Sequence, residues 1–234
     1  MGGARLIAIG ALALAACGDG TPTYRVSGNA FDFTGSPDVR LAGATITLVE
    51  DPTRTAITAA DGGFAFDGFA EGEQVTFDLT YPNFHPVRTG TLVMPAADVE
   101  RLSFQVPPEA IFTVLAESLA IVPDPTKCQI VTTVTRIGRS IYDPGAHGEA
   151  GATVAIAPAV GVAEGPIYFN SSVQPERGLT ETSDDGGVLF LNVTPGEYWL
   201  TATKPGATFR TFAMKCAAGL LVNASPPWGL QRLE

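Results

Sequence analysis

Apolar and polar residues alternate along much of the chain, and this period of two is typical of β-strands with one buried face. The clearest stretches lie at residues 45–48, 64–66 and 75–80, where an apolar residue occupies every second position. Between the first two stretches, Asp61-Gly62 is a strong signal for a tight hairpin turn. Such strands recur about every 8–12 residues between Gly, Pro and Asp, which predicts an all-β protein built as an antiparallel β-sandwich.

Two parts of the chain repeat each other. Residues 41–48 match residues 149–156 around a shared Ala-Gly-Ala-Thr, at an offset of 108 positions. Residues 58–66 match residues 182–190 around a shared Asp-Gly-Gly, at an offset of 124 positions. A Gly-Glu pair follows in each copy. The second copy therefore carries 16 additional residues between its two blocks.

The shared blocks resemble the carboxypeptidase regulatory-like domain in three motifs: Gly-Ala-Thr-(Ile/Val), Thr-x-x-Asp-Gly-Gly and (Glu/Pro)-Gly-Glu. The resemblance implies two tandem transthyretin-like (prealbumin-like), Ig-like sandwiches of about seven strands each, in residues 24–106 and 128–234. The second copy, with Pro-Gly-Glu, is closer to the family's pattern than the first copy, which has Glu-Gly-Glu. Because these motifs describe turns and core positions, they indicate fold and not function.

Residues 107–127, between the repeats, change to the spacing of an amphipathic helix. Pro108 suits a first helical turn, and Pro123 would end the helix. We expect a short helical linker that packs on the second sandwich through one apolar stripe: Ile111, Leu115, Leu119 and Val122. A partner-binding or membrane-surface helix is the alternative, although the segment lacks the Lys/Arg face of an interfacial helix.

The N-terminus has the pattern of a signal peptide at residues 1–16. Arg5 precedes an apolar run that ends at Ala16, shorter than the about 20 residues of a membrane span. Small residues then lead into Cys17, and this arrangement resembles the lipobox of bacterial lipoproteins. The resemblance implies cleavage before Cys17 and lipidation of its thiol, with residues 17–23 as a flexible tether. The alternative is an ordinary signal peptide with a chance cysteine.

Composition narrows the class of partner. The chain has a formal net charge of -10 at pH 7 and no basic cluster, so we expect no nucleic-acid partner. Once Cys17 is assigned to the lipid, Cys128 and Cys216 remain as an even pair, which predicts a disulfide in an oxidising compartment. Two free buried thiols are the alternative.

No catalytic residue, metal site or cofactor is expected from the sequence. His85 and His147 lie in different copies, in segments that resemble loops, and neither has a partner at metal-ligand spacing. No Gly-x-Ser-x-Gly elbow is present, and hairpin turns account for Asp61 and Asp185 without calcium. An unrecognised hydrolase would need a polar cluster that only coordinates can show.

The insertion in the second copy, residues 158–178, suits ligand binding. It is rich in Gly and Pro and holds Tyr168, Phe169 and Asn170, and aromatic faces beside an amide suit sugar rings. The alternative is an extra strand that places Ile167 and Phe169 in the core.

The C-terminal tail, residues 223–230, is too apolar for a disordered end. We expect Trp228 and Leu230 to dock back on the second sandwich. A ligand role for Trp228 is the alternative.

These features together predict a non-enzymatic lipoprotein of the cell envelope that acts as a structural or protein-interaction module. Gly18, and not Asp, follows Cys17, which favours the outer membrane, with the body facing the periplasm or the cell surface. The alternative function is a carbohydrate-binding module that uses the loop at 158–178. The expected partners are the membrane, through the lipid, and envelope proteins or glycans.

Overall fold

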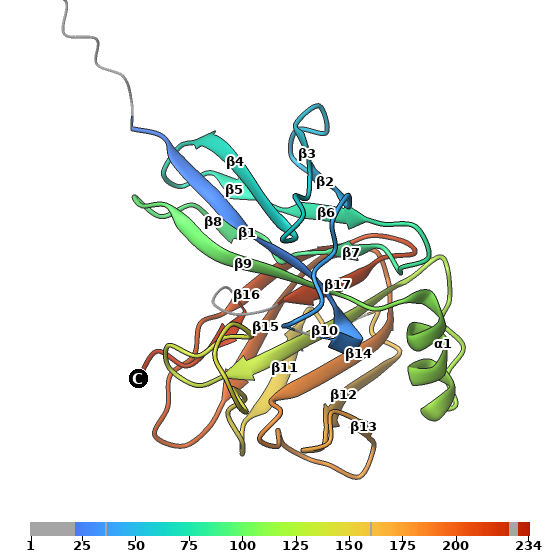
Figure 1. Ribbon diagram of the computed structural model, residues 1–234. Coiled ribbons are helices and arrows are strands. Elements are labelled where there is room, and N and C mark those ends of the chain that lie inside the picture. Colours follow the sequence, from blue (N-terminus) through green and yellow to red (C-terminus); the bar gives the residue numbers. More distant parts are fainter. Residues whose placement is uncertain (1–21, 36, 160, 225–228) are drawn as a thin grey trace, which may run out of the picture.

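The computed structural model describes four ranges of the chain: 22–35, 37–159, 161–224 and 229–234. The predicted signal peptide, Cys17 and Trp228 lie outside these residues. Strands are the main regular structure of the described chain, and one short α-helix, α1 (Glu109–Ser118), lies among them (Figure 1). The all-β sandwich predicted from the alternation is therefore confirmed. Within the described ranges, no helix is long and apolar enough to span a membrane.

Two sheets enclose the core of residues 24–106, which we call the N-terminal half. The first sheet has the order β4-β1-β9, with bounds β1 (Tyr24–Asp32), β4 (Gly63–Phe69) and β9 (Val99–Val106). The second runs β3-β2-β6-β7, with bounds β2 (Thr45–Leu48), β3 (Thr55–Ile57), β6 (Phe77–Thr80) and β7 (Val87–Arg88). A 3-10 turn (Phe33–Gly35) follows β1, and a short separate pair joins β5 (Gln74–Val75) and β8 (Leu92–Val93).

Residues 128–234, which we call the C-terminal half, repeat this plan with additions. The strands β14-β10-β17 correspond to β4-β1-β9, because in both the central strand pairs antiparallel on one side and parallel on the other. The bounds of these three strands are β10 (Cys128–Thr135), β14 (Gly187–Val193) and β17 (Leu221–Ala224). The additions are β12 (Glu164–Phe169) and β13 (Pro175–Glu176) in the same sheet, and β18 (Leu230–Gln231), which pairs with β10. The opposing sheet comprises β11 (Thr153–Ala157), β15 (Gly196–Thr203) and β16 (Phe212–Cys216).

The repeated sequence blocks form the same hydrogen bonds in both halves. In the first copy the hydroxyl of Thr58 accepts from the backbone N–H of Ala44 at 2.8 Å and donates to the carbonyl of Leu41 at 2.6 Å. In the second copy Thr182 makes the matching bonds, at 2.9 Å and 2.5 Å. The shared threonine therefore ties the two motif blocks of each copy together.

The Asp-Gly-Gly turns also match. Asp61 and Asp185 each accept from the backbone N–H two residues later, at 2.9 Å and 3.0 Å. The glycine between has a φ of 71° in the first copy and 78° in the second. A side chain is disfavoured in this left-handed region, which explains why both copies have glycine there.

The two halves share one sheet, which is not evident from the sequence. β17 pairs in parallel with β10 on one side and with β7 on the other, so a ten-stranded sheet runs through both halves (Figure 1). Adjacent residues of β17 then serve different cores: Leu221 packs in that of the N-terminal half and Val222 in that of the C-terminal half. Backbone pairing and packing therefore hold the halves together in addition to the linker.

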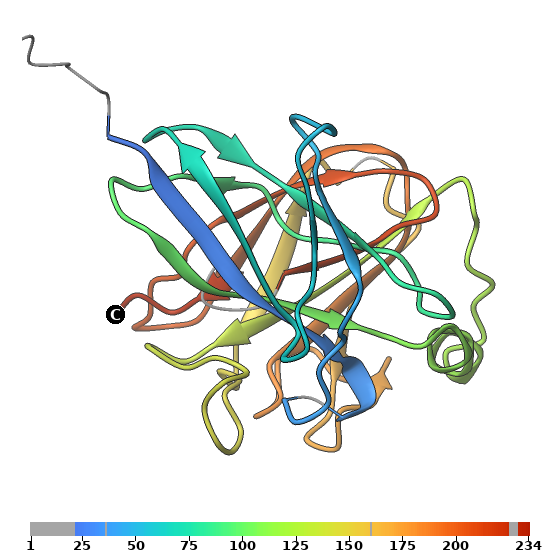
Figure 2. The ribbon, with the colours of Figure 1, turned by 45° about the horizontal axis from the view of Figure 1, so that its top comes forward.

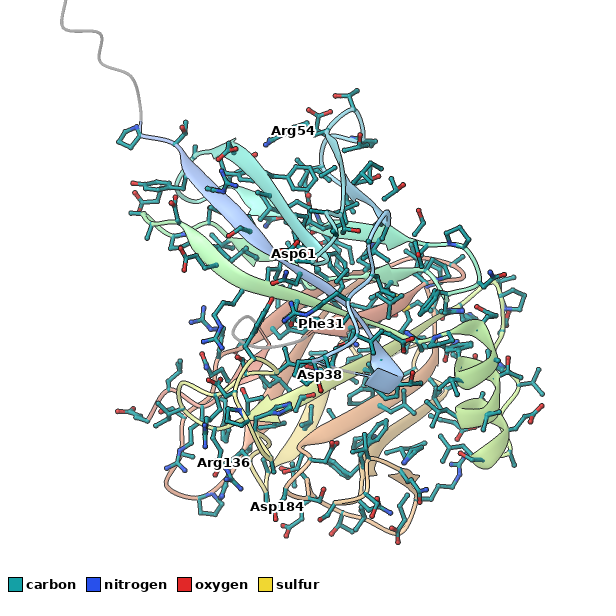
Figure 3. The ribbon with its side chains drawn as sticks, viewed as in Figure 1. Phe31, Asp38, Arg54, Asp61, Arg136 and Asp184 are labelled. Atoms are coloured by element: carbon teal, nitrogen blue, oxygen red, sulfur yellow. A yellow bond between two sulfur atoms is a disulfide. The ribbon has the colours of Figure 1, made fainter. Side chains whose placement is uncertain are left out.

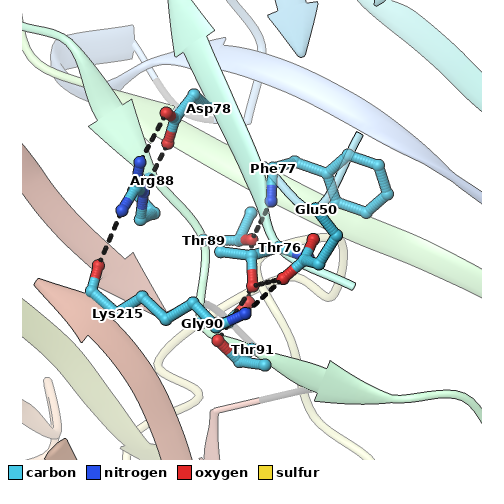
Figure 4. A network of polar contacts seen from close by, with 9 residues as sticks. All are labelled: Glu50, Thr76, Phe77, Asp78, Arg88, Thr89, Gly90, Thr91 and Lys215. Carbon is cyan, nitrogen blue, oxygen red and sulfur yellow. Dashed lines mark hydrogen bonds and ion pairs between the residues drawn. The ribbon is translucent and has the colours of Figure 1, made fainter. Parts of the chain in front are cut away.

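Polar contacts around β7 add to this junction (Figure 4). The guanidinium of Arg88 donates to both carboxylate oxygens of Asp78, at 2.6 and 2.7 Å, and to the carbonyl of Lys215 at 3.0 Å. The Lys215 ammonium donates to Glu50 at 2.7 Å, and the Thr76 hydroxyl donates to the same oxygen at 2.7 Å. All four charged side chains are partly buried, so salt screens these bonds less than it screens surface pairs.

Gly90 allows the two halves to approach closely. A β-carbon added at Gly90 would lie 1.5 Å from the ring of Phe212, which is buried in the core of the C-terminal half. We expect Gly90→Ala to lower the free energy of unfolding by about 1–3 kcal/mol, because the ring must move from its site. Chemical denaturation measures this loss. The control is Gly178→Ala, where the nearest atom to an added β-carbon is 3.9 Å away; equal losses in both variants would contradict the close contact.

α1 is the predicted linker helix, but it is shorter than the predicted apolar stripe requires. The helix starts after Pro108, as predicted, and ends before Leu119, and Ala120 then has a φ of 55°. Leu119 is buried in an apolar cluster with residues of the C-terminal half, whereas Val122 is 85% exposed, so the predicted stripe is wrong at its last position. The side chain of Arg177 donates to the Leu119 carbonyl at 3.1 Å. Figures 1 and 2 show α1 at the outer edge of the molecule.

Cys128 and Cys216 form the predicted disulfide. Their Cα atoms are 5.8 Å apart, and the bond joins the first residue of β10 to the last residue of β16. These strands belong to opposing sheets, so the bond crosses the core of the C-terminal half. The alternative of two free thiols is wrong.

Candidate functional site

A cleft lies where the two halves meet, over the sheet that they share. Its volume is about 820 Å³, which is within the range of about 300–1,000 Å³ typical of small-molecule sites. One side is the middle of β10, and the rest comes from the segment after β1, the loop at 141–147 and the turns that flank β12 and β14. Its lining includes Phe33, Val131, Tyr142, His147, Phe169 and Asp185.

Tyr142 fixes the loop that forms one wall of the cleft. Its hydroxyl donates to the side-chain oxygen of Asn29 at 3.0 Å, and its ring meets Phe31 edge to face, with 5.3 Å between the centroids. Figure 3 places Phe31 where β1 reaches the C-terminal half. The guanidinium of Arg101 lies 4.7 Å from the Tyr142 centroid, a cation–π contact. Burial raises the pKa of Tyr142 to about 12, so the phenol stays neutral and keeps its proton to donate.

Asp143, in the same loop, is a carboxylate that already has partners. It accepts from the backbone N–H of Ser140 at 2.8 Å and from the Ser140 hydroxyl at 3.0 Å, and Arg101 lies 3.5 Å away. Burial acts to raise the pKa of Asp143, but these hydrogen bonds and the charge of Arg101 lower it overall. Asp143 is therefore ionised and paired.

His147 and Asp185 form the other polar part of the cleft. Burial lowers the pKa of His147, and the negative charge of Asp185 offsets part of that effect. Burial raises the pKa of Asp185, against the hydrogen bond from the Gly187 N–H and the charge of His147. The imidazole of His147 is therefore neutral at pH 7.

In an NMR titration, His147 should titrate below its ordinary pKa of 6.5. Asp185→Asn removes a charge that favours the imidazolium, so the midpoint should fall further. The pKa of His147 is lower in the folded protein than in the unfolded chain, where it has its ordinary value of 6.5. The stability that this group contributes is therefore present above pH 6.5, and it is lost as the pH falls through 6.5 toward the folded pKa. Asp184→Asn is the control, since Asp184 is exposed and lies 3.5 Å from Arg136 (Figure 3). A midpoint at or above 6.5 would contradict the burial.

An apolar cavity of about 70 Å³ adjoins the cleft beneath α1. Phe33, Val131 and Phe169 line both spaces. The outer face of a sandwich sheet is usually polar, but α1 covers this one, so its residues are apolar. Further residues of this lining are aliphatic: Leu115, Ala116, Leu119, Leu189 and Leu191.

His85 belongs to a separate hollow beside α1, of about 440 Å³. Its ring stacks on Phe112 with 3.7 Å between the centroids, and its Nδ1 lies 3.0 Å from the carboxylate of Glu109. These contacts hold the first turns of α1 against the loop after β6. His85 is thus accounted for by packing of the helix.

The structure places Tyr168 and Phe169 in strand β12 and not in an open loop. They are 2% and 6% exposed, because apolar clusters cover both faces of β12. The Tyr168 hydroxyl accepts from the backbone N–H of Val154 at 2.9 Å, which is a core contact. The prediction of a sugar-binding loop is therefore wrong for these two residues, and the alternative, an extra strand that buries Ile167 and Phe169, is confirmed.

Asn170 closes the turn between β12 and β13. Its side-chain oxygen accepts from the backbone N–H groups of Ser172 and Gln174, at 2.9 and 3.1 Å. Val173, in the same turn, has a φ of 60°, which is rare for a β-branched residue. The geometry of the turn accounts for Asn170, and carbohydrate binding is not supported.

The C-terminal tail docks on the C-terminal half, as predicted. Leu230 is fully buried, and β18 pairs with Val134 and Thr135 of β10. Trp228 lies outside the described residues, so its role stays a prediction.

Sequence reasoning missed the cleft, although the repeat carried a signal for it. The residues just before the Ala-Gly-Ala-Thr block lie against the Asp-Gly-Gly turn: a β-carbon added at Gly148 would be 2.2 Å from the backbone of Asp185. This contact brings the preceding residue, His147, close to the turn. The first copy has Val39 at that position, so only the second copy places a histidine beside the aspartate.

The described residues do not include any group of three or more His, Cys, Asp or Glu side chains placed to hold a metal ion. The cleft combines one neutral imidazole, one paired carboxylate and one carboxylate beside aromatic walls. This arrangement suits binding of a ligand.

No protein-family model and no curated protein matches the chain. Among solved structures, the Bacillus anthracis TIE protein is similar, with a TM-score of 0.30 and 11% identity over 86% of this chain and 33% of that chain. GBS52, the minor pilin of Streptococcus agalactiae, has a TM-score of 0.28 and 10% identity over 90% of this chain and 97% of that one. The shaft pilin SpaA from Lactobacillus rhamnosus GG has a TM-score of 0.26 and 12% identity over 87% of this chain and 97% of that one. The chain thus spans 33% of the first of these proteins, and at such scores the similarities carry no argument about function.

Proposed function

We propose that the protein is a non-enzymatic lipoprotein of the cell envelope, whose rigid body acts as a protein-interaction module at the membrane surface. The observation that carries the proposal is the ten-stranded sheet, which joins both halves into one body. The disulfide and the partly buried ion pairs around β7 stiffen this body further. Such a body keeps a fixed distance between its attachment point and a distant surface.

The course of β1 supports this arrangement. β1 starts at Tyr24, directly after the proposed tether, and its nine residues span about 30 Å at about 3.3 Å each. Phe33, the next residue, lines the cleft. A lipid on Cys17 would therefore hold the outer end of the N-terminal half near the membrane and present the cleft about 30 Å beyond the start of β1.

The charge of the chain bears on the choice of partner. A net charge of -10 favours partners with basic surfaces and disfavours nucleic acids. We therefore place the partner among envelope proteins, and the anchor in the outer membrane because Gly18 follows Cys17.

Metabolic labelling with a clickable fatty acid tests the anchor. The wild type should carry the label and remain with the membranes, and Cys17→Ser should lose both properties. A variant that combines Cys128→Ser with Cys216→Ser retains Cys17 and should keep the label. Label on Cys17→Ser would refute lipidation at this residue.

Photo-crosslinking in intact cells tests the interaction module. A photoreactive residue in place of Val173, exposed at the rim of the cleft, should form a cross-link to an envelope protein. The matched control replaces Ile57, exposed on β3 at the other end of the molecule (Figure 1). Equal products from both positions, or no product from Val173, would contradict a specific interaction surface near the cleft.

A further inference from the structure

We propose that the cleft and the adjoining apolar cavity form one binding site for a small organic cation. Its ammonium group would lie at Asp185, and its unbranched apolar stem would extend beneath α1. This proposal is independent of the membrane anchor.

The cleft contains one carboxylate without a cationic side chain beside it. Among the described residues, no Lys or Arg lines the cleft, and none forms an ion pair with Asp185. The other carboxylate, Asp143, is already paired with Arg101 at 3.5 Å. Asp185 accepts from the backbone N–H of Gly187 through Oδ2, at 3.0 Å. A carboxylate has about four acceptor positions, so Asp185 keeps capacity for a ligand.

An aromatic ring lies beside this carboxylate. A β-carbon added at Gly187 would be 2.5 Å from Oδ2 of Asp185 and 2.8 Å from Cδ2 of Phe169. Oδ2 of Asp185 and the Phe169 ring therefore both lie close to Gly187, and both side chains line the cleft. An ammonium group that binds Asp185 from the cleft would lie near the Phe169 ring, where a cation–π contact adds to the ion pair.

The apolar cavity accommodates the stem. Five residues line both the cleft and the cavity: Phe33, Val131, Phe169, Gln105 and Asn223. A stem that passes from the cleft into the cavity therefore follows three apolar side chains and two amides. Beyond these residues the cavity is lined by Leu189 of β14 and Ala116 of α1, among others. Each methylene buried along this path should increase affinity about three- to fourfold.

The charge of the site selects against an acid of the same shape. An alkyl carboxylate would bring a second negative charge to Asp185, in a chain that already carries a net charge of -10. A neutral alcohol would keep the apolar contacts and lose the ion pair. Cation, alcohol and acid are therefore expected to bind in that order.

NMR titration tests the proposal on the full-length chain with Cys17→Ser, which keeps the sample free of lipid and detergent. The probes are n-butylamine and n-hexylamine, with 1-hexanol and hexanoate matched to the longer stem. We expect n-hexylamine to bind about tenfold more tightly than 1-hexanol and more tightly than n-butylamine, and hexanoate to bind weakest.

Two substitutions locate the ends of the ligand. Asp185→Asn retains an acceptor for the Gly187 N–H, and it should weaken n-hexylamine about tenfold while leaving 1-hexanol unchanged. Asp184→Asn replaces the exposed neighbouring aspartate and should change the affinity for neither n-hexylamine nor 1-hexanol. Ala116→Leu fills the cavity and should remove the advantage of n-hexylamine over n-butylamine.

Several results would overturn the proposal. Equal binding of n-hexylamine and 1-hexanol would show that the ammonium group does not bind at Asp185. Equal losses of n-hexylamine affinity in Asp184→Asn and Asp185→Asn would show the same. If Ala116→Leu still bound the longer amine more tightly than the shorter one by the same factor, then the stem would not lie in the cavity. No binding of any probe would exclude the site. Unchanged melting temperatures verify that the variants are folded, and the aspartate variants test the site independently if Ala116→Leu does not fold.

Discussion

Replacing Cys128 and Cys216 together by alanine is expected to lower the free energy of unfolding by about 4–5 kcal/mol. The disulfide spans a sequence separation of 88 residues. A long loop in the unfolded chain regains much conformational entropy when its cross-link is removed, so the unfolded state becomes more favourable. Urea unfolding of the oxidised wild type and of the double variant measures the difference.

A reductant provides the control for this prediction. The reduced wild type should unfold at the same urea concentration as the double variant, and the double variant should not respond to the reductant. If the double variant were as stable as the oxidised wild type, then the cross-link would not constrain the unfolded chain.

The second large effect is expected at Glu149, whose side chain is 6% exposed. Its carboxylate accepts from the ammonium of Lys204 and from the guanidinium of Arg232, the latter at 3.1 Å. Glu149→Ala should lower the free energy of unfolding by about 3 kcal/mol, because it leaves two partly buried cations without their counter-charge. Calorimetry or urea unfolding measures this loss.

A matched surface variant separates this effect from a general loss of acidic charge. Glu197 is exposed on β15, so Glu197→Gln should change stability by no more than about 0.5 kcal/mol. Glu149→Gln keeps the shape of the side chain and should give an intermediate loss. Similar stability of Glu149→Ala and Glu197→Gln would show that the buried carboxylate has no special role.

The strands and the repeat were predictable because their signals are local. Alternation identified Ile46 and Leu48 as core residues, and both are buried. The threonine shared by the two copies, Thr58 and Thr182, proves to bond the same pair of backbone groups in each half. A motif that recurs within one chain thus pointed to one recurring set of hydrogen bonds.

The junction could not be predicted, because its pairing is distant in sequence. Leu221 pairs with Val87 in parallel, and a parallel partner is not specified by any turn between the strands. Gly90 and Phe212 similarly show no pattern in the sequence that would bring them together. Only the assembled sheet explains why a glycine stands opposite a buried aromatic ring.

The insertion shows a limit of periodicity. Ile167, Tyr168 and Phe169 are consecutive apolar residues, and such a short run does not distinguish a buried strand from an apolar loop. The structure buries both faces of β12 at these three residues, so their burial shows no alternation. His147 and Asp185 were each assigned to a loop or turn, and their proximity became apparent only when the two motif blocks packed together.

The position of β17 bears on how the protein is made. The chain is synthesised from its N-terminus, so the N-terminal half leaves the ribosome before β17 follows. Until then the edge of β7 has no neighbouring strand, and an unpaired edge is where chains associate with one another. Correct folding therefore depends on keeping newly synthesised chains apart, or on shielding this edge, until residues 221–224 have emerged.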